Sequence, residues 1–154
     1  MQIEFTKKDS DTHFLRVRRA DGSEASAELH TKTYLLHDLC HFGVEKQLRY
    51  EKGFWGMLAA GHAFDQLNGK QNSLTNELRF IEKIVGPVQS IVSGHLAAGD
   101  FAMSTSYLES DAARNLDVEQ VVEMIQDLLR KWNRLPFGQS LILQFEYTWE
   151  IPCR

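Results

Sequence analysis

The sequence has few cysteines and no long hydrophobic run. Its two cysteines, Cys40 and Cys153, form neither a disulfide framework nor a C-x-x-C metal motif. No stretch of about 18 apolar residues occurs, as a membrane-spanning helix would need, and the first eight residues contain no apolar signal region. We therefore expect a soluble cytoplasmic protein that does not contact a membrane.

A basic excess is also absent. The 17 lysines and arginines are outnumbered by 21 aspartates and glutamates, and the formal net charge is -4. Proteins that bind nucleic acid usually carry a basic surplus or a basic stripe. The densest basic stretch, Arg16 to Arg19, suits the solvent side of a β-hairpin. We therefore expect no nucleic-acid partner.

Several well-known catalytic signatures are missing as well. The chain contains no G-x-S-x-G, no phosphate-binding loop and no G-x-G-x-x-G after a predicted strand. The sequence therefore gives no support to a nucleophile-elbow hydrolase, a P-loop nucleotide-binding protein or a dinucleotide-binding enzyme. A length of 154 residues, with 43% hydrophobic and 25% charged residues, is typical of one globular domain, residues 1–154.

Alternating apolar and polar residues predict strands at both ends of the chain. Ile3 and Phe5 alternate with polar residues, residues 13–19 do the same, and Asp21-Gly22 suits a tight turn before another alternating run. The first thirty residues therefore predict a three-stranded antiparallel meander. Residues 141–150, which include Tyr147 and Trp149, predict a last strand that joins this meander.

Between the strands, apolar residues recur every three or four positions and predict about five helices. We expect them at residues 34–51, 54–67, 74–85, 88–98 and 117–132. Gly86-Pro87 is expected to end the third helix, because proline lacks an amide donor. Asp117 can cap the fifth helix, with Gln120 at the capping-box position, while the aperiodic residues 99–111 predict a loop. The expected fold is α+β, an antiparallel sheet of about four strands packed against about five central helices.

Residues 35–45 concentrate side chains that can bind metal in one apolar helical segment. His37 and His41 are four residues apart, so a helix places them one above the other, and Glu45 continues that face. Two imidazoles at this spacing bind a divalent ion in the H-E-x-x-H helices of zinc proteases, where the glutamate is the general base. Here Asp38, which is one methylene shorter, occupies the position of that glutamate, so we do not infer proteolysis.

A metal site needs a third protein ligand. Glu45 is one candidate, followed by His62 and Asp65 in the next predicted helix, with His95 and Asp100 further along the chain.

The first functional hypothesis is a protein that binds zinc or another divalent metal through His37 and His41, completed by Glu45 or His62. Asp38 would orient a ligand or assist a bound water, and the protein would be a metal-dependent hydrolase whose substrate the sequence does not specify.

The alternative hypothesis is a non-catalytic structural or protein-interaction module, for example a homodimer. Leu35, Leu39 and Phe42 lie on the helix side opposite the histidines, whereas Val44 shares the histidine side. A helix covered on two faces can hold core histidines that are hydrogen-bonded by a carbonyl or a carboxylate. Metal content distinguishes the two hypotheses.

Two resemblances to known families involve the same segment. Leu35-Leu36-His37-Asp38-Leu39 is similar to the histidine-aspartate core of the HD-domain phosphohydrolases, and that resemblance implies metal ligands at His37 and Asp38. The stretch from His37 to Gly56, with H-D-L-x-H-F-x-V-E followed by G-F-W-G, resembles a group of uncharacterised small bacterial proteins. The second resemblance implies a bacterial protein but no activity and no catalytic residue.

Overall fold

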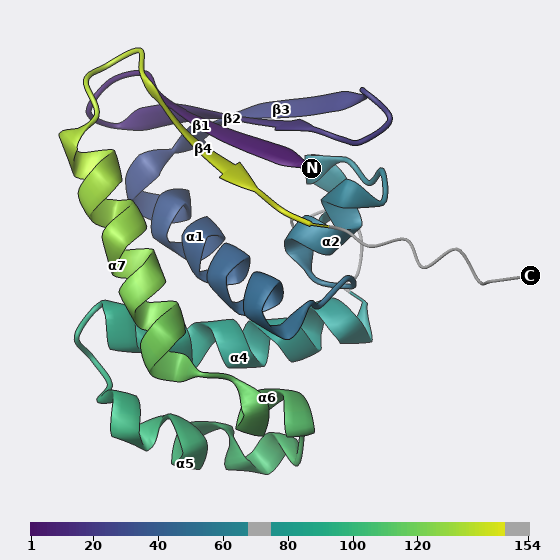
Figure 1. Ribbon diagram of the computed structural model, residues 1–154, viewed down its shortest axis with the longest axis vertical. Coiled ribbons are helices and arrows are strands. Elements are labelled where there is room, and N and C mark those ends of the chain that lie inside the picture. The colour runs from purple at the N-terminus through teal and green to yellow at the C-terminus, as the bar shows by residue number, and fades with distance from the viewer. Residues whose placement is uncertain (68–74, 147–154) are drawn as a thin grey trace, which may run out of the picture.

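The computed structural model describes residues 1–67 and 75–146. Figure 1 shows the sheet at one end of the molecule, α1 running away from it, and α4 crossing below α1. In chain order the elements are β1 (Gln2–Lys7), β2 (Thr12–Arg18), β3 (Glu24–His30), α1 (Thr31–Leu48), α2 (Phe54–Ala59), α3 (Phe64–Leu67), α4 (Asn76–Val92), η1 (Ala98–Asp100), α5 (Phe101–Thr105), η2 (Ser106–Leu108), α6 (Asp111–Asn115), α7 (Val118–Arg134) and β4 (Ser140–Gln144).

The predicted α+β fold is confirmed. The four strands form one antiparallel sheet in the order β3-β2-β1-β4, so the strand near the end of the chain pairs with the first strand. Alternate residues on one face, Ile3, Phe5, Leu15 and Val17, are buried, as the period-two pattern predicted. The predicted strand positions Tyr147 and Trp149 lie outside the described residues.

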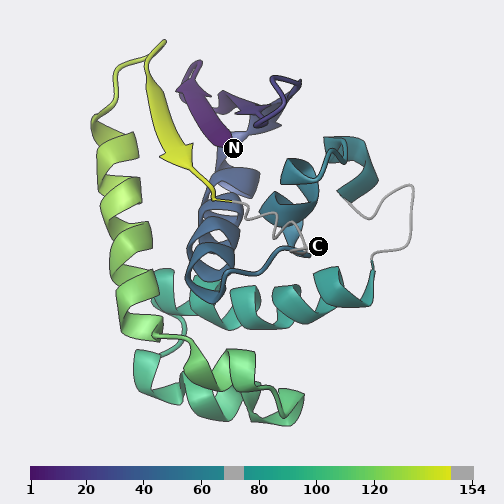
Figure 2. The same cartoon turned by 45° about the vertical axis from the view of Figure 1, so that its right-hand side comes forward.

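Helix α1 is the centre of the fold. Every residue from Asp38 to Glu45 is buried, and Figure 2 shows α1 lying between α7 and α2. Helix α7 approaches closely at Gly43, where an added Cβ would lie 3.2 Å from Val121 and 3.3 Å from Ile125. The helix ends at Leu48 rather than at the predicted residue 51, because Arg49 adopts a left-handed conformation with φ 51°.

The helical region departs from the predicted boundaries at other places too, among them the predicted helix 88–98, whose end lies at Val92. Helix α4 runs unbroken through Gly86-Pro87, so the predicted break is wrong; Val85 and Val88 on either side of the proline are buried, and their packing outweighs its missing donor. The predicted helix 54–67 divides into α2 and α3, because Gly61 has φ +108°. The predicted loop 99–111 contains α5 and two short 3-10 segments.

The described residues thus form seven α-helices, and Leu74 of the predicted third helix lies outside the described residues. None of the described helices is long and apolar enough to cross a bilayer.

The start of α7 is capped as predicted, with help from another helix. The side chain of Asp117 accepts a hydrogen bond from the Gln120 amide at 3.1 Å. In a capping box the Gln120 side chain would accept from the Asp117 amide, but Gln47 of α1 accepts that bond at 2.7 Å and donates to Gln120 Oε1 at 3.0 Å. The two hydrogen bonds of Gln47 therefore connect α1 to the start of α7.

His13 of β2 is fully buried in the core. Its Nδ1 lies 2.9 Å from Thr31 Oγ1, and its ring contacts Phe5 and Trp132. Its Nε2 has no hydrogen-bond partner within the part of the chain that the structure describes. Burial lowers the pKa of His13 to about 4, because a charged imidazole is poorly solvated there.

This buried histidine predicts a loss of stability in mild acid. The unfolded chain binds a proton at His13 with a pKa of about 6.5, whereas the folded pKa is about 4. The neutral His13 therefore makes its full contribution to the free energy of unfolding above pH 6.5, and this contribution is lost as the pH drops toward 4. Relative to His13→Phe, the wild type should lose roughly 1–2 kcal/mol of its free energy of unfolding between pH 7 and pH 5, measured by urea unfolding. An equal decrease in both proteins would assign the effect to other groups.

Candidate metal centre

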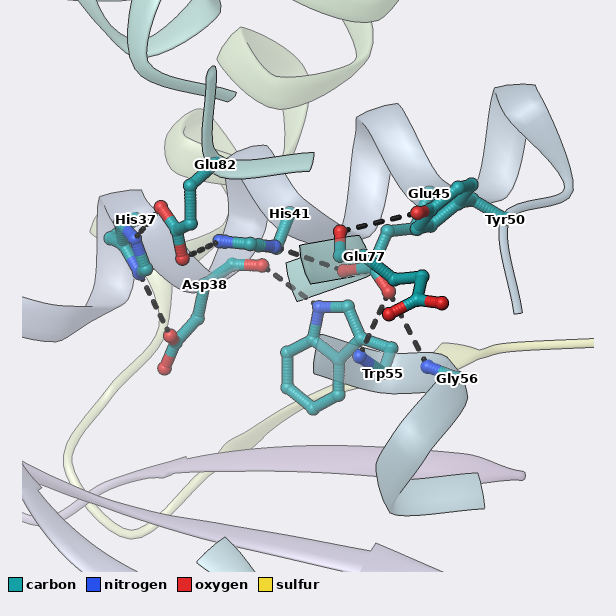
Figure 3. Close-up of polar contacts among 9 residues, drawn as sticks. All are labelled: His37, Asp38, His41, Glu45, Tyr50, Trp55, Gly56, Glu77 and Glu82. Atoms are coloured by element: carbon teal, nitrogen blue, oxygen red, sulfur yellow. Dashed lines mark hydrogen bonds and ion pairs between the residues drawn. The ribbon is translucent and has the colours of Figure 1, made fainter. Parts of the chain in front are cut away.

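His37 and His41 of α1 converge with Glu82 of α4 (Figure 3). The Nε2 atom of His37 lies 3.3 Å from Glu82 Oε2, and the Nε2 atom of His41 lies 2.8 Å from Glu82 Oε1. One potential ligand atom from each residue lies within 4.8 Å of the other two. Tetrahedral zinc, with bonds of about 2.0–2.1 Å, separates neighbouring ligand atoms by about 3.3 Å. The three side chains therefore have a spacing that can hold a metal ion.

The packing of α1 on α4 brings these residues together. The rings of His37 and His41 lie with their centroids 4.6 Å apart, which confirms their predicted common face. Leu78 and Ile81 of α4 are buried, and Glu82 stands beside them at the edge of the apolar face. Tyr50, just after α1, donates a hydrogen bond to the carbonyl of Glu77 at 3.1 Å and so fixes the start of α4.

Each histidine also has a carboxylate on its other nitrogen. The Nδ1 atom of His41 lies 3.0 Å from Glu45 Oε2, and the Nδ1 atom of His37 lies 3.5 Å from Asp38 Oδ1. A carboxylate at Nδ1 keeps a proton on that nitrogen and directs the lone pair of neutral imidazole to Nε2. Both Nε2 atoms face Glu82. This pairing of carboxylate with histidine is typical of metal sites in proteins.

Glu45, predicted as a ligand, lies behind His41 and is not a member of the three-residue group. Its side chain is fully buried. One oxygen accepts from His41, and the other accepts from the backbone amides of Trp55 at 3.0 Å and Gly56 at 3.3 Å. The indole of Trp55 in turn donates to the carbonyl of Asp38 at 3.1 Å. Glu45 therefore joins α1 to the start of α2 and orients His41.

The glycines of the G-F-W-G stretch are explained by this junction. An added Cβ at Gly53 would collide with the side chain of Glu45, and one at Gly56 would collide with the backbone of Glu51. Both positions therefore require a residue without a side chain. The G-F-W-G stretch thus marks the connection between Glu45 and α2.

The other predicted ligands do not join the group in the described residues. His62 lies between α2 and α3, and its carbonyl accepts a hydrogen bond from Arg19 at 2.8 Å. Asp65 lies on α3, Asp100 ends η1, and His95 is an exposed residue after α4. A metal-ligand role for His62 stays a prediction.

The carboxylates around His37 and His41 favour a positive charge between these two rings and Glu82. Burial acts to raise the pKa of Glu82, but hydrogen bonds from His37 and His41 outweigh it and hold that pKa well below its usual range. Contacts with Asp38 and Glu82 raise the pKa of His37 to about 9. Burial acts to lower the pKa of His41, but Glu45 and Glu82 together raise it. Protons on the two Nε2 atoms or a divalent cation can supply the positive charge that Glu82 faces.

The group is enclosed on one side and open on the other. The side chain of His41 is fully buried, whereas those of His37 and Glu82 are 36% and 41% exposed. His37, Asp38 and Glu82 line part of a cavity of about 660 Å³. A ligand entering that cavity would reach His37 and Glu82 directly.

Glu82 is the member of this group that the sequence analysis missed. It is 45 residues from His37, on a helix whose ordinary composition gave no sign of chemistry. The one local signal is its position: at 100° per residue it stands on the boundary of the stripe formed by Leu78, Ile81 and Val85. A carboxylate at such a boundary is also common on ordinary amphipathic helices.

No protein-family model, curated protein or solved structure matches this chain. The resemblances to HD-domain phosphohydrolases and to small bacterial proteins therefore stay predictions. The described residues carry a group, His37, His41 and Glu82, that can hold a metal ion, and its function has to be inferred from its own geometry.

Proposed function

We propose that the protein binds one divalent transition-metal ion, zinc in the first instance, through His37, His41 and Glu82, and that it is a metal-dependent hydrolase. The observation that carries this proposal is the carboxylate at the Nδ1 side of both histidines. With Nδ1 protonated, each ring in its neutral form presents its Nε2 lone pair toward Glu82, so a metal ion there would replace the protons that otherwise join the two Nε2 atoms to Glu82.

The ligand count supports a catalytic site. Structural zinc sites are usually closed by four protein ligands, whereas catalytic sites have three and leave a position open. The group in the described residues has two histidines and one glutamate, a donor set found in zinc hydrolases. It also borders a cavity. A metal held there supplies Lewis-acid catalysis of hydrolysis.

Asp38 has a positioning role in this proposal. It is almost fully buried, and burial raises its pKa. Its Oδ1 faces His37 Nδ1 at 3.5 Å, so it orients that ring toward the metal. The catalytic role predicted for Asp38 thus becomes an action through His37.

Metal content tests the proposal directly. Protein produced without a metal-affinity tag, loaded with zinc and dialysed, should retain about one equivalent by elemental analysis. The double variant His37→Ala/His41→Ala should retain less than about a tenth of an equivalent, because two of three ligands are gone. His62→Ala is the matched control and should retain zinc, since the group does not include its side chain.

Two results would contradict the proposal. If the wild-type protein retains no zinc and gains no thermal stability from added zinc, His37 and His41 are protonated and form ion pairs with Glu82, with no metal between them. The protein would then fit the alternative of a non-catalytic structural or interaction module. Zinc retained without any hydrolysis of chromogenic esters, amides or phosphoesters would leave a metal-binding protein that is not a hydrolase.

A further inference from the structure

The cavity beside His37 and Glu82 exists because β3 has small side chains on the inner face of the sheet. On the inner face of the sheet, Val17 of β2 pairs with Ala25 of β3, and Leu15 pairs with Ala27. The β2 residues are fully buried, whereas both alanines are only half-buried. Small side chains at these two positions leave a volume that the neighbouring helices do not fill. The result is the cavity of about 660 Å³.

The walls of this cavity are mostly apolar and partly aromatic. Strand β3 contributes Ala25, Ala27 and Leu29, and the opposite elements contribute Phe54 and Phe64. The rings of Phe54 and Phe64 lie 6.3 Å apart between centroids, and Phe54 also contacts the ring of His41 at 5.9 Å. An aromatic surface therefore leads directly to the proposed metal ligands. The volume lies within the range of about 300–1,000 Å³ usual for small-molecule sites.

The charges of the lining restrict what can bind. The lining contains the carboxylates of Asp38, Asp65 and Glu82, and His37 is its one basic residue among those described. Phosphate and carboxylate ligands are usually bound by arginine, lysine or backbone amides at a helix N-terminus. Neither lysine nor arginine belongs to this described lining. A neutral or amine-bearing molecule fits it, and a phosphoester does not.

The elements that form the walls are tied together. Arg19, the residue after β2, donates hydrogen bonds to the carbonyls of Leu58 in α2 and of His62 between α2 and α3. Glu45 holds the start of α2 from the other end. The hairpin and the helices across the cavity are therefore fixed relative to each other, as expected of a pre-formed pocket.

We infer that this cavity is the substrate pocket of the metal centre, and that the substrate is an ester or amide with an apolar, preferably aromatic, body and no anionic group. The inference rests on the proposed function. In the reaction, the oxygen of water bonds to the carbonyl carbon and the bond from that carbon to the ester oxygen or amide nitrogen breaks. One proton of the water passes to the leaving alcohol or amine, and the acid product releases the other.

Hydroxamic acids of increasing size test the inference, because a hydroxamate binds zinc in place of the carbonyl group. Calorimetric titration of zinc-loaded protein should show benzohydroxamic acid binding at least about tenfold more tightly than acetohydroxamic acid, since the phenyl ring is buried. 4-Carboxybenzohydroxamic acid should lose that advantage, because its second carboxylate meets the acidic lining.

Variants of the pocket separate its role from that of the metal. Ala27→Phe should remove the advantage of the phenyl ring while zinc content and acetohydroxamic acid affinity stay unchanged. Glu28→Phe, on the opposite face of the same strand, is the matched control and should bind both compounds like wild type. Phe64→Ala provides a second variant without added bulk and should weaken benzohydroxamic acid about tenfold with zinc retained.

The outcomes distinguish the two proposals. If the protein binds one equivalent of zinc but binds acetohydroxamic acid and benzohydroxamic acid equally tightly, the cavity is not the substrate pocket, whereas the proposed metal site is unaffected. An advantage that persists in both Ala27→Phe and Phe64→Ala would place the binding site elsewhere and overturn the inference as well. Protein without zinc would overturn the proposed function, and this inference with it.

Discussion

Glu45→Ala is expected to lower the free energy of unfolding of the metal-free protein by about 3–5 kcal/mol and to weaken zinc binding about 10- to 100-fold. The substitution removes a fully buried carboxylate that accepts hydrogen bonds from His41, Trp55 and Gly56. His41 loses the group that holds its proton on Nδ1, and two backbone amides at the start of α2 lose their acceptor. Urea unfolding and zinc titration against a chromogenic chelator measure the two effects.

Glu45→Gln separates the two roles of this residue. Its amide oxygen can still accept from the α2 backbone, so part of the lost stability should return. Its amide nitrogen can only donate to His41, which then carries its proton on Nε2, the nitrogen required for the metal. Zinc affinity should therefore stay low. Glu123→Ala on the exposed side of α7 is the control, with an expected change within about 0.5 kcal/mol. Wild-type zinc affinity in Glu45→Gln would rule out the orienting role.

Gly56→Ala is expected to lower the free energy of unfolding by about 2–3 kcal/mol, although alanine normally favours a helix. The new methyl group would meet the backbone carbonyl of Glu51, which cannot swing away as a side chain would. The start of α2 must shift, and the amides that donate to Glu45 shift with it. Zinc affinity should fall in parallel, measured by the same chelator titration.

Gly86→Ala is the matched control for this prediction. Gly86 lies inside α4, and an added Cβ there has nothing within 4 Å among the described residues other than its chain neighbours, Val85 and Pro87, and the nearby backbone of its own helix. Alanine should therefore change the free energy of unfolding by less than about 1 kcal/mol, because its higher helix propensity is offset by the contact of its Cβ with the ring of Pro87. Urea unfolding of both variants would contradict the close-contact argument if Gly56→Ala were as stable as Gly86→Ala.

The sequence predicted those features that depend on local periodicity. Alternation placed the meander, and a spacing of four placed His37 and His41 on one face of a helix. The cap at Asp117 was equally legible, because the side chain bonds an amide three residues away. In each case the interacting groups are neighbours along the chain or repeat at a fixed interval.

Features set by contacts between distant segments were not predictable from the sequence. Glu82 enters the site only because α4 crosses α1, and one sequence does not specify that crossing. The break expected at Gly86-Pro87 was wrong for a similar reason: a local penalty was outweighed by burial on both sides of Pro87. Glu45 was predicted on the correct face, but its bonds to the amides of α2 depend on how the chain returns after Arg49.

His37, His41 and Glu82 differ in how strongly a substitution would disturb the core. His41 is fully buried in the helix around which the molecule folds, whereas the Glu82 side chain is 41% exposed on α4. Substitution at His41 therefore alters folding and chemistry together, while substitution at Glu82 leaves the core intact. In the proposed metal site, a substitution made to change the metal preference, for example from glutamate to aspartate or histidine, should therefore disturb the core least at position 82. Directed evolution of this centre should begin there.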